Sequence, residues 1–381
     1  MTGMASPTTQ PPNTTRWSGR IRRNFVPAAQ RARPPRPEDT VAFGTAPTPH
    51  MLTARFHPDS GWEDPEIVPY APLNFTPDSV VFHYGQQIFE GLKAYRGSGQ
   101  DGGIYLFRPE MNAARFFRSA ERLAMAPVPE DMFLACVREL VAIEADWILP
   151  QPWSLYIRPF LVPLDRGVSL RASRSYLFVV IVTPVSAYYA SPDGVVVTIE
   201  RNLVRAAPGG VGEAKCGGNY AASLLPLARA RSEGAEQVLW LDAAEHQFVE
   251  EVGAMNIMFV YGQRILTPKL VGSILPGVTR DSVIKLAPTL GYTVEEARLP
   301  IDRVLADIKS GVLTECFGCG TAAVISPVCG IIDGDQRHNL GPIRPDSTAL
   351  RLKKALCDIQ SGAAPDPFGW RQPLTPASKA I

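Results

Sequence analysis

The chain has 381 residues, of which 45% are hydrophobic and 20% are charged, and its formal net charge is +1. This suits two globular domains of ordinary size, and the balanced charge gives no argument for binding nucleic acid or a membrane surface. The most apolar run, residues 176–185, has the length of a strand and not of a membrane span. Among the six cysteines, Cys316 and Cys319 form one CxxC without a second pair or a nearby histidine, and the five histidines show no ligand spacing. We therefore expect reduced thiols, no metal and a cytoplasmic protein.

The N-terminal segment differs from the rest in charge. Residues 1–37 hold seven arginines and no acidic residue, which leaves the body of the chain mildly acidic. Such a segment can be an organelle transit peptide or a solvated tail. Because Pro11, Pro12, Thr14 and Thr15 do not suit a helix, we predict that residues 1–39 are a disordered Arg- and Pro-rich tail, with organelle import left open.

The next region, residues 40–188, mixes both kinds of secondary structure. Short apolar runs predict strands, at 103–107, 155–161 and 175–182. Apolar residues at helical spacing predict two helices, from about 111 to 123 and from about 131 to 147. We expect this region to be a small N-terminal α/β domain, and the turn-rich sequence SAYYASPDG places an interdomain linker at 189–194.

The last region, residues 195–381, is expected to be the larger domain. Apolar runs predict strands at 195–200, 237–241 and 256–261. Helical spacing recurs at 219–233, 278–290, 302–310 and 347–361. Strands and helices alternate without a strict βαβ rhythm, so the predicted fold class is α+β, or mixed α/β, in two domains.

The most informative segment is GGVGEAKCGGNY, residues 209–220, in which five glycines surround Lys215. Glycine allows close approach to a ligand but loses much conformational entropy on folding, so such a cluster indicates a tight fit around the lysine. The pattern GxxxxGK[ST] is absent, which excludes a Walker A loop. A buried lysine can supply a neutral amine to an imine-forming cofactor, although this segment alone also fits an incidental lysine in a surface loop.

Six strings in register carry a family resemblance: FEGLKAY (89–95), YIRPF (156–160), GGNYAASL (217–224), EEVGAMNI (250–257), LPGVTRDS (275–282) and GTAAVI (320–325). Together they resemble the branched-chain amino-acid aminotransferases of fold type IV, which depend on pyridoxal 5'-phosphate (PLP). The resemblance extends from about Phe43 to Trp370. It implies a D-amino-acid aminotransferase-like fold whose two domains hold the cofactor between them.

The resemblance assigns cofactor roles to several residues. Lys215 is similar to the lysine that carries the cofactor as a Schiff base and moves the proton between Cα and C4′. Glu251 matches the carboxylate facing the pyridine nitrogen, and Tyr220 the phenol bonded to the ring oxygen. The phosphate and the remaining cofactor contacts fall to Arg115, Arg205, Val278, Thr279 and Thr321. From the residues alone, Arg115 would be a solvated helix position, Glu251 a surface acid and Tyr220 a core side chain.

The substrate pocket is also implied by resemblance. Its residues would be Phe43, Tyr84, Phe89, Tyr156, Arg158, Tyr188 and Ala322. An aromatic box suits a branched aliphatic side chain, and Arg158 would bind the distal carboxylate of glutamate or 2-oxoglutarate. The family forms homodimers or larger oligomers in which Tyr84 reaches the neighbouring subunit, so the expected partners are amino acids, 2-oxo acids and further copies of this chain.

The implied function is transamination of L-leucine, L-isoleucine and L-valine with 2-oxoglutarate. One departure from the family keeps an alternative open: residues 161–168 read LVPLDRGV, without the usual Glu-Pro and Leu-Gly-Val. The alternative is a fold type IV aminotransferase acting on another aliphatic or aromatic amino acid in a specialised biosynthetic pathway. A catalytically inactive PLP-fold binding protein is a third reading, which the presence of Lys215 and Glu251 disfavours.

Overall fold

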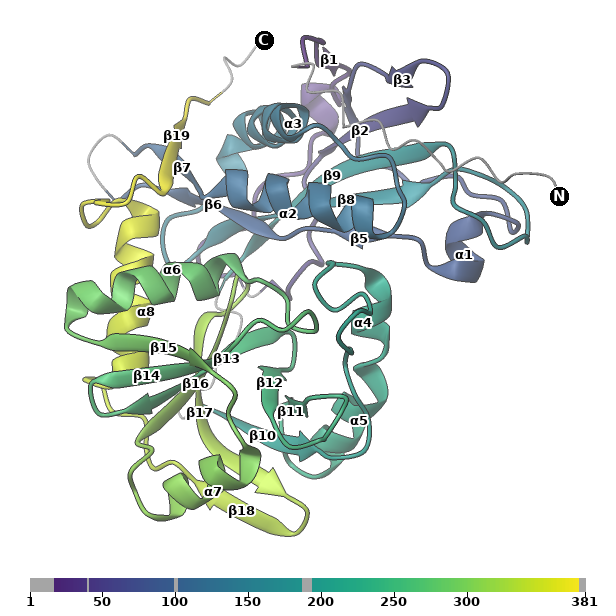
Figure 1. Ribbon diagram of the computed structural model, residues 1–381. Coiled ribbons are helices and arrows are strands. Elements are labelled where there is room, and N and C mark those ends of the chain that lie inside the picture. The colour runs from purple at the N-terminus through teal and green to yellow at the C-terminus, as the bar shows by residue number, and fades with distance from the viewer. Residues whose placement is uncertain (1–16, 40, 99–101, 187–193, 377–381) are drawn as a thin grey trace, which may run out of the picture.

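The computed structural model describes residues 17–39, 41–98, 102–186 and 194–376. Figure 1 shows two halves, each built on one large sheet, with the earlier part of the chain above and the later part below. The predicted linker, residues 189–194, lies outside the described residues apart from Gly194, and the domain boundary there stays a prediction.

In the described residues the first sheet has ten strands in the order β1-β4-β2-β9-β8-β6-β7-β19, with β3 beside β2 and β5 beside β8. The central pair, β8 and β9, is rich in Val, Leu and Ile and almost wholly buried, as expected for strands covered on both faces. The strands are β1 (Arg22–Arg23), β2 (His50–His57), β3 (Gly61–Trp62), β4 (Glu66–Pro69), β5 (Ile88–Phe89), β6 (Leu92–Arg96), β7 (Ile104–Phe107), β8 (Ser154–Pro163), β9 (Tyr176–Val185) and β19 (Arg371–Leu374).

Two long helices, α2 (Pro109–Arg122) and α3 (Glu130–Ile143), cover one face of this sheet (Figure 1). Helix α2 begins with a proline, whose missing N–H is harmless in the first turn. Its buried Phe116 packs against Phe133 of α3 and Phe178 of β9, which places the core between helices and sheet. The shorter helices here are α1 (Val80–Tyr84) and the 3₁₀ turns η1 (Ala28–Gln30) and η2 (Ala145–Trp147).

The prediction of a disordered tail is wrong for residues 17–39. Trp17, Ile21 and Phe25 pack against the first core, and the backbone amide of Trp17 donates to Asp131 Oδ2 at 2.7 Å. Strand β1 pairs in parallel with β4. The Arg- and Pro-rich composition concealed three apolar side chains spaced by four residues, which bury against the sheet and α3 in a largely non-helical conformation.

In the described residues the second sheet has nine strands, and β12 pairs with both β11 and β13, so the path β12-β11-β10-β17-β16-β13 closes on itself. Apolar side chains such as Val197, Ile257 and Phe259 form its core. The strands are β10 (Val195–Glu200), β11 (Gln237–Leu241), β12 (Val249–Val252), β13 (Met255–Tyr261), β14 (Arg264–Pro268), β15 (Thr293–Ala297), β16 (Glu315–Gly320), β17 (Val324–Asp333) and β18 (Gln336–Asn339).

The helices of the second half are α4 (Gly217–Ala221), α5 (Leu224–Ser232), α6 (Val278–Leu286), η3 (Ala287–Leu290), α7 (Ile301–Lys309) and α8 (Thr348–Ser361). The single helix predicted for 219–233 is therefore interrupted between α4 and α5, and Pro288 marks the change from α6 to the 3₁₀ turn η3. Helix α8 leads back to the first sheet, where β19 pairs with β7 (Figure 1).

Two features are absent from the described residues. None of the helices in these ranges combines the length and the apolar character needed to cross a membrane. Within the same ranges, no group of three or more His, Cys, Asp or Glu side chains is arranged to hold a metal ion.

Candidate active site

A cavity of about 500 Å³ lies where the two halves meet. Twelve of the fifteen predicted site residues line it: Phe43, Phe89, Arg115, Tyr156, Arg158, Lys215, Tyr220, Glu251, Val278, Thr279, Thr321 and Ala322. Arg205 lies directly behind, in a small cavity that it shares with Tyr220 and Glu251. Segments far apart in the sequence therefore converge on one site.

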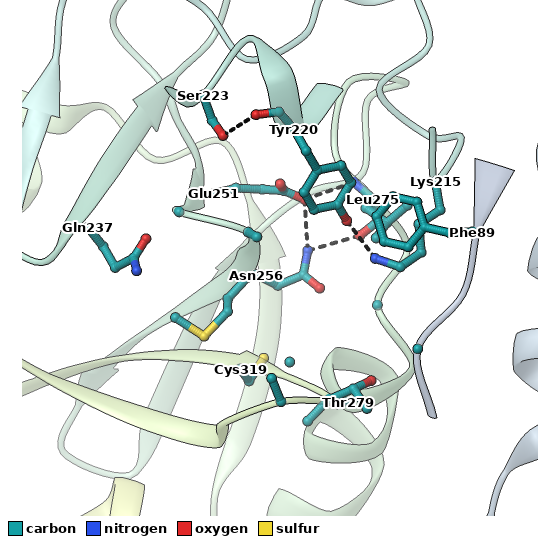
Figure 2. A pocket seen from close by; sticks show the side chains of 18 of the residues that line it. Phe89, Lys215, Tyr220, Ser223, Gln237, Glu251, Asn256, Leu275, Thr279 and Cys319 are labelled. Carbon is teal, nitrogen blue, oxygen red and sulfur yellow. Dashed lines mark hydrogen bonds between the residues drawn. The ribbon is translucent and has the colours of Figure 1, made fainter. Parts of the chain in front are cut away.

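Lys215 is held by the first half of the molecule although it belongs to the second. Its backbone amide donates to Ser119 Oγ of α2 at 3.0 Å, and its carbonyl accepts from the Phe89 amide of β5 at 2.9 Å. Its Nζ donates to the Tyr220 hydroxyl at 2.5 Å and lies 4.7 Å from the centre of the Phe89 ring (Figure 2). The two halves thus jointly fix the position of the amine.

The environment of Lys215 favours the neutral amine. Burial, followed by the positive charge of Arg115, lowers the pKa of Lys215 to about 8. Glu90 acts in the opposite direction but does not cancel these effects. A lysine with a lowered pKa is available near neutral pH as a nucleophile and as a proton acceptor.

The glycines before Lys215 are needed for a close approach of two backbone segments. A Cβ on Gly212 would overlap the carbonyl oxygen of Ser273, and Gly209 has φ +78°, which favours glycine. Arg122 of α2 donates to the carbonyls of Gly209 and Gly210, each at 2.9 Å from Nη2. The glycine-rich segment is therefore fixed on both sides.

Tyr220 comes from α4, one turn after Lys215, and packs on Phe89 with ring centroids 4.8 Å apart. Burial, with the charge of Glu251 adding to it, raises the pKa of the Tyr220 phenol well above its ordinary value. The phenol stays protonated at physiological pH, so it is a hydrogen-bond donor next to the lysine amine.

Glu251 is buried in β12 and held by several groups. Its Oε2 pairs with Arg205 Nε at 2.9 Å, and its Oε1 accepts from the Leu275 amide at 2.9 Å and from Asn256 Nδ2 at 3.3 Å (Figure 2). Burial raises the pKa of this carboxyl, while Arg205 and the Leu275 amide act to lower it. The carboxylate is thus fixed in one orientation at the cavity wall.

The start of α6 is the predicted position for the phosphate. Gly277 precedes the helix, and a Cβ there would displace the Oδ1 of Asn256. The first amides of a helix have no intrahelical acceptor and lie at the positive end of its dipole, which favours an anion near Val278 and Thr279. Thr321, which follows the end of β16, lines the same cavity and adds a hydroxyl group.

Arg115 lines the cavity, but its guanidinium is already paired. Its Nε and Nη2 donate to the two oxygens of Glu90 at 2.6 and 2.8 Å, and Nη1 donates to the Pro276 carbonyl at 3.1 Å. Glu90 is 0% exposed and also accepts from Asn112. Although burial acts to raise it, Arg115 holds the pKa of Glu90 below its ordinary value. A direct phosphate contact of Arg115 stays a prediction.

The opposite wall of the cavity is aromatic. Phe43 contacts Tyr156 edge to face, with centroids 4.8 Å apart. Arg158 lies over the Phe89 ring and donates from Nη2 to the Tyr156 hydroxyl at 2.9 Å. Gly91 is required beneath this group, because a Cβ there would overlap the Tyr156 hydroxyl oxygen.

One predicted substrate residue in the described ranges does not line the cavity. Tyr84, at the end of α1, is 41% exposed and donates to the Val168 carbonyl, so its predicted reach into a neighbouring subunit stays a prediction. Tyr188 lies outside the described residues.

Sequence reasoning missed four polar residues of the site: Ser119, Glu90, Lys93 and Asn256. Glu90 and Lys93 lie within FEGLKAY, and Asn256 within EEVGAMNI, so the motifs contained the signal. Their roles depend on contacts with distant segments, as in the bond of Lys93 to Ala322.

The family described as Amino-transferase class IV matches residues 87–331 of this chain. A probable branched-chain-amino-acid aminotransferase of Streptomyces coelicolor is 46% identical, over 87% of this chain and 92% of its own. Branched-chain-amino-acid transaminase 1 of Bacillus subtilis is 45% identical, over 87% and 93%.

Similar solved structures are also branched-chain aminotransferases. The branched-chain aminotransferase of Escherichia coli superposes with a TM-score of 0.68 at 28% identity, covering 81% of this chain and 96% of its own. The T.th. branched-chain aminotransferase complexed with N-(5'-phosphopyridoxyl)-L-glutamate gives 0.67 at 28% identity, covering 84% and 97%. The chain therefore belongs to the class IV aminotransferases and, within them, to the branched-chain-amino-acid aminotransferases.

Proposed function

We propose that this chain transfers the amino group of L-leucine, L-isoleucine or L-valine to 2-oxoglutarate with pyridoxal 5'-phosphate, giving branched 2-oxo acids and L-glutamate. The observation that carries the proposal is the Lys215 amine, whose pKa is lowered to about 8 and whose Nζ lies 2.5 Å from the Tyr220 hydroxyl in a cavity shared with Glu251. The names of the bacterial relatives support the substrate class.

The donor set of the cavity fits this cofactor. A lysine amine suits the aldehyde, a buried carboxylate at Glu251 suits a protonated ring nitrogen, and the first amides of α6 suit the phosphate. Tyr220 and Thr321 add hydroxyl groups for the ring oxygen and the phosphate. When bound, the cofactor supplies an aldehyde that condenses with amines and a pyridinium ring that withdraws electrons from the substrate Cα.

Lys215 and Glu251 have separate roles in the reaction. Lys215 Nζ would hold the cofactor through its aldehyde, and the same amine would accept the proton from the substrate Cα. The Ser119 and Phe89 contacts to its backbone hold that amine in place. Glu251, fixed by Arg205 and the Leu275 amide, would hold its carboxyl group against the ring nitrogen.

The substrate side combines apolar and cationic surface. Phe43, Phe89 and Tyr156 offer aromatic contacts that suit a branched aliphatic side chain. Arg158 has no carboxylate partner within the described chain, and its Nε makes no hydrogen bond there. It is therefore free to bind the second carboxylate of 2-oxoglutarate, so one pocket serves both half-reactions.

We further propose a homodimer or larger oligomer in the cytoplasm. Large apolar side chains are exposed on α1 and on the loop after β8, where Phe82 is 62%, Val168 68% and Leu170 79% exposed. A patch of this kind is typical of a subunit contact. All six cysteines are free thiols, as is usual in a reducing compartment. Sedimentation of the holoenzyme tests the oligomer, and a fully active monomer would contradict it.

Product analysis tests the proposed reaction. The purified holoenzyme is mixed with 2-oxoglutarate and one amino acid at a time, and L-glutamate and the new 2-oxo acid are quantified. We expect turnover with leucine, isoleucine and valine and at least about tenfold less with aromatic and acidic alternatives except glutamate. Turnover with another amino acid in place of these three would overturn the substrate class and leave the chemistry intact.

A further inference from the structure

Lys93 is a buried cation on the same face of the first sheet as the aromatic wall of the cavity. It lies in β6 and pairs directly across from Tyr156 of β8, so the two side chains project from the same face. The residue is only 6% exposed. Its Nζ crosses to the other half of the molecule and donates to the carbonyl oxygen of Ala322 at 2.8 Å.

The acceptor belongs to a strained turn. Residues 320–324 connect β16 to β17, and Val324 has φ +61°, a left-handed conformation that is costly for a β-branched residue. Such a conformation persists only when surrounding contacts hold it. The turn carries Thr321 and Ala322, which line the main cavity, so its conformation decides where their polar groups lie.

No carboxylate forms an ion pair with Lys93 in the part of the chain that the structure describes. The ionisable groups around it are Tyr95, Cys357 and Lys353, of which Lys353 carries the same charge as Lys93. Burial, the main cause, lowers the pKa of Lys93 to about 8. A buried cation without an acid is costly, and the cost is relieved either by loss of the proton or by a nearby anion.

The position of such an anion follows from a second, small cavity. Lys93, Thr279 and Thr321 line a space of about 20 Å³, which is large enough for about one water molecule. Both threonines also line the main cavity, and Thr279 lies in the first turn of α6. Lys93 therefore lies behind the predicted phosphate position, on the far side of these two threonines.

We propose that Lys93 is a positioning residue for the phosphate end of the active site: it fixes the Thr321–Ala322 turn through the Ala322 carbonyl, and its charge strengthens anion binding at the start of α6. The inference rests on the proposed function, which assigns the phosphate of the cofactor to the start of α6. The cation acts through its neighbours and contacts no reacting atom.

Sulfate binding tests the proposal without turnover. Sulfate keeps its charge between about pH 6 and 10, and its affinity for the cofactor-free full-length protein is measured by titration calorimetry. At pH 7 we expect Lys93→Met to weaken sulfate binding roughly tenfold, since one buried cation is lost beside the anion site. Lys93→Arg should restore most of the affinity. Lys353→Met, which removes the neighbouring charge outside the small cavity, is the matched control and should change affinity less than about twofold.

The pH dependence of the sulfate affinity distinguishes an effect of the Lys93 charge from an effect of its packing. Lys93 is charged below about pH 8, so wild-type affinity for sulfate should be full there and fall as the pH rises above 8. Lys215 titrates in the same range, but it is present in Lys93→Arg as well. The wild type should therefore lose more affinity than Lys93→Arg between about pH 7 and 9.5, and this comparison holds even if Lys93→Met does not fold.

Two outcomes would overturn the proposal. One is equal sulfate affinity in the wild type and in folded Lys93→Met, with matching pH profiles in the wild type and Lys93→Arg. The other is equal weakening in Lys93→Met and Lys93→Arg, which would mean that packing and not charge decides. A failure of the proposed enzyme function would appear separately, as a missing transamination product with anion binding intact.

Discussion

Two kinds of basic side chain line the active-site region, and they differ in whether a carboxylate pairs with them. Arg115 pairs with Glu90, and Arg205 pairs with Glu251. Lys215 and Arg158 have no such ion pair in the described part of the chain and meet hydroxyl groups and aromatic rings instead. The paired arginines build the wall of the site, whereas the unpaired bases are available to a cofactor or a substrate.

The pKa values of the paired and the unpaired basic side chains differ in the same way. Burial acts against the charged form of both Arg115 and Lys215, but Glu90 reverses this for Arg115, whose pKa is raised. For Lys215 burial prevails, and the pKa is lowered to about 8. A carboxylate partner thus decides whether a buried base is a fixed charge or a reactive amine.

Breaking the Arg115–Glu90 pair should have the largest effect of these changes, a loss of folding stability. Glu90→Gln leaves a buried guanidinium without its acid, and we expect the free energy of unfolding to fall by about 3–5 kcal/mol in urea titrations. Glu110→Gln, on the adjacent helix α2 and partly exposed, is the control and should cost less than about 1 kcal/mol. A loss below about 1 kcal/mol in Glu90→Gln would show that the pair is not structural.

Removing the acid from the Arg205–Glu251 pair should lower kcat more than it lowers the stability of the fold. Glu251→Gln removes the negative charge from the cavity wall, and we expect kcat to fall at least about a hundredfold, about 2.7 kcal/mol in activation free energy. Glu250→Gln removes a charge from the neighbouring residue, which does not line the main cavity, and should leave kcat within about threefold. Equal kcat values for the two variants would exclude the assigned role of Glu251.

Removing the unpaired base Arg158 should weaken the binding of 2-oxoglutarate but not that of L-leucine. Arg158→Met removes the cation proposed to bind the distal carboxylate, and we expect KM for 2-oxoglutarate to rise at least tenfold, about 1.4 kcal/mol. KM for L-leucine, which has no second carboxylate, should change less than about threefold. Steady-state kinetics with each substrate varied in turn gives both values, and a parallel rise in both would show that Arg158 only supports the wall.

The smallest expected effect concerns Glu250 and the stability of the protein. Burial raises the pKa of Glu250 to about 6 against an ordinary value of 4.5. Between these values the folded protein binds more protons than the unfolded chain, so the free energy of unfolding should decrease as pH rises through this window. Glu250→Gln lacks this loss and should be more stable than the wild type at about pH 7.5, by on the order of 1 kcal/mol, with a smaller gap at about pH 5. A pH-independent gap would contradict the prediction.

Much of the second half could be predicted from local pattern. The predicted strands at Val195–Glu200 and Gln237–Leu241 have the observed bounds, since each is a short apolar run flanked by polar or turn residues. The observed helix at 348–361 begins where Ser347 Oγ accepts from the Leu350 amide, a cap that the sequence signals.

The contacts that complete the site could not be predicted in this way. Ser119 binds the Lys215 amide across 96 residues, and Glu90 meets Arg115 through the packing of β5 on α2. The ordered segment around Trp17 and Phe25 depends on a surface that only the folded sheet provides. The family motifs indicated the type of reaction, but they did not indicate which basic side chains would form an ion pair with a carboxylate.

The central claim is that Lys215 is the unpaired amine on which the reaction depends. The most direct test is the visible absorption spectrum of the full-length protein with pyridoxal 5'-phosphate, compared with Lys215→Ala, before and after L-leucine is added. We expect a cofactor band that depends on Lys215 and that leucine converts to the pyridoxamine form in the wild type. A wild-type spectrum identical to that of Lys215→Ala, and unchanged by leucine, would contradict it.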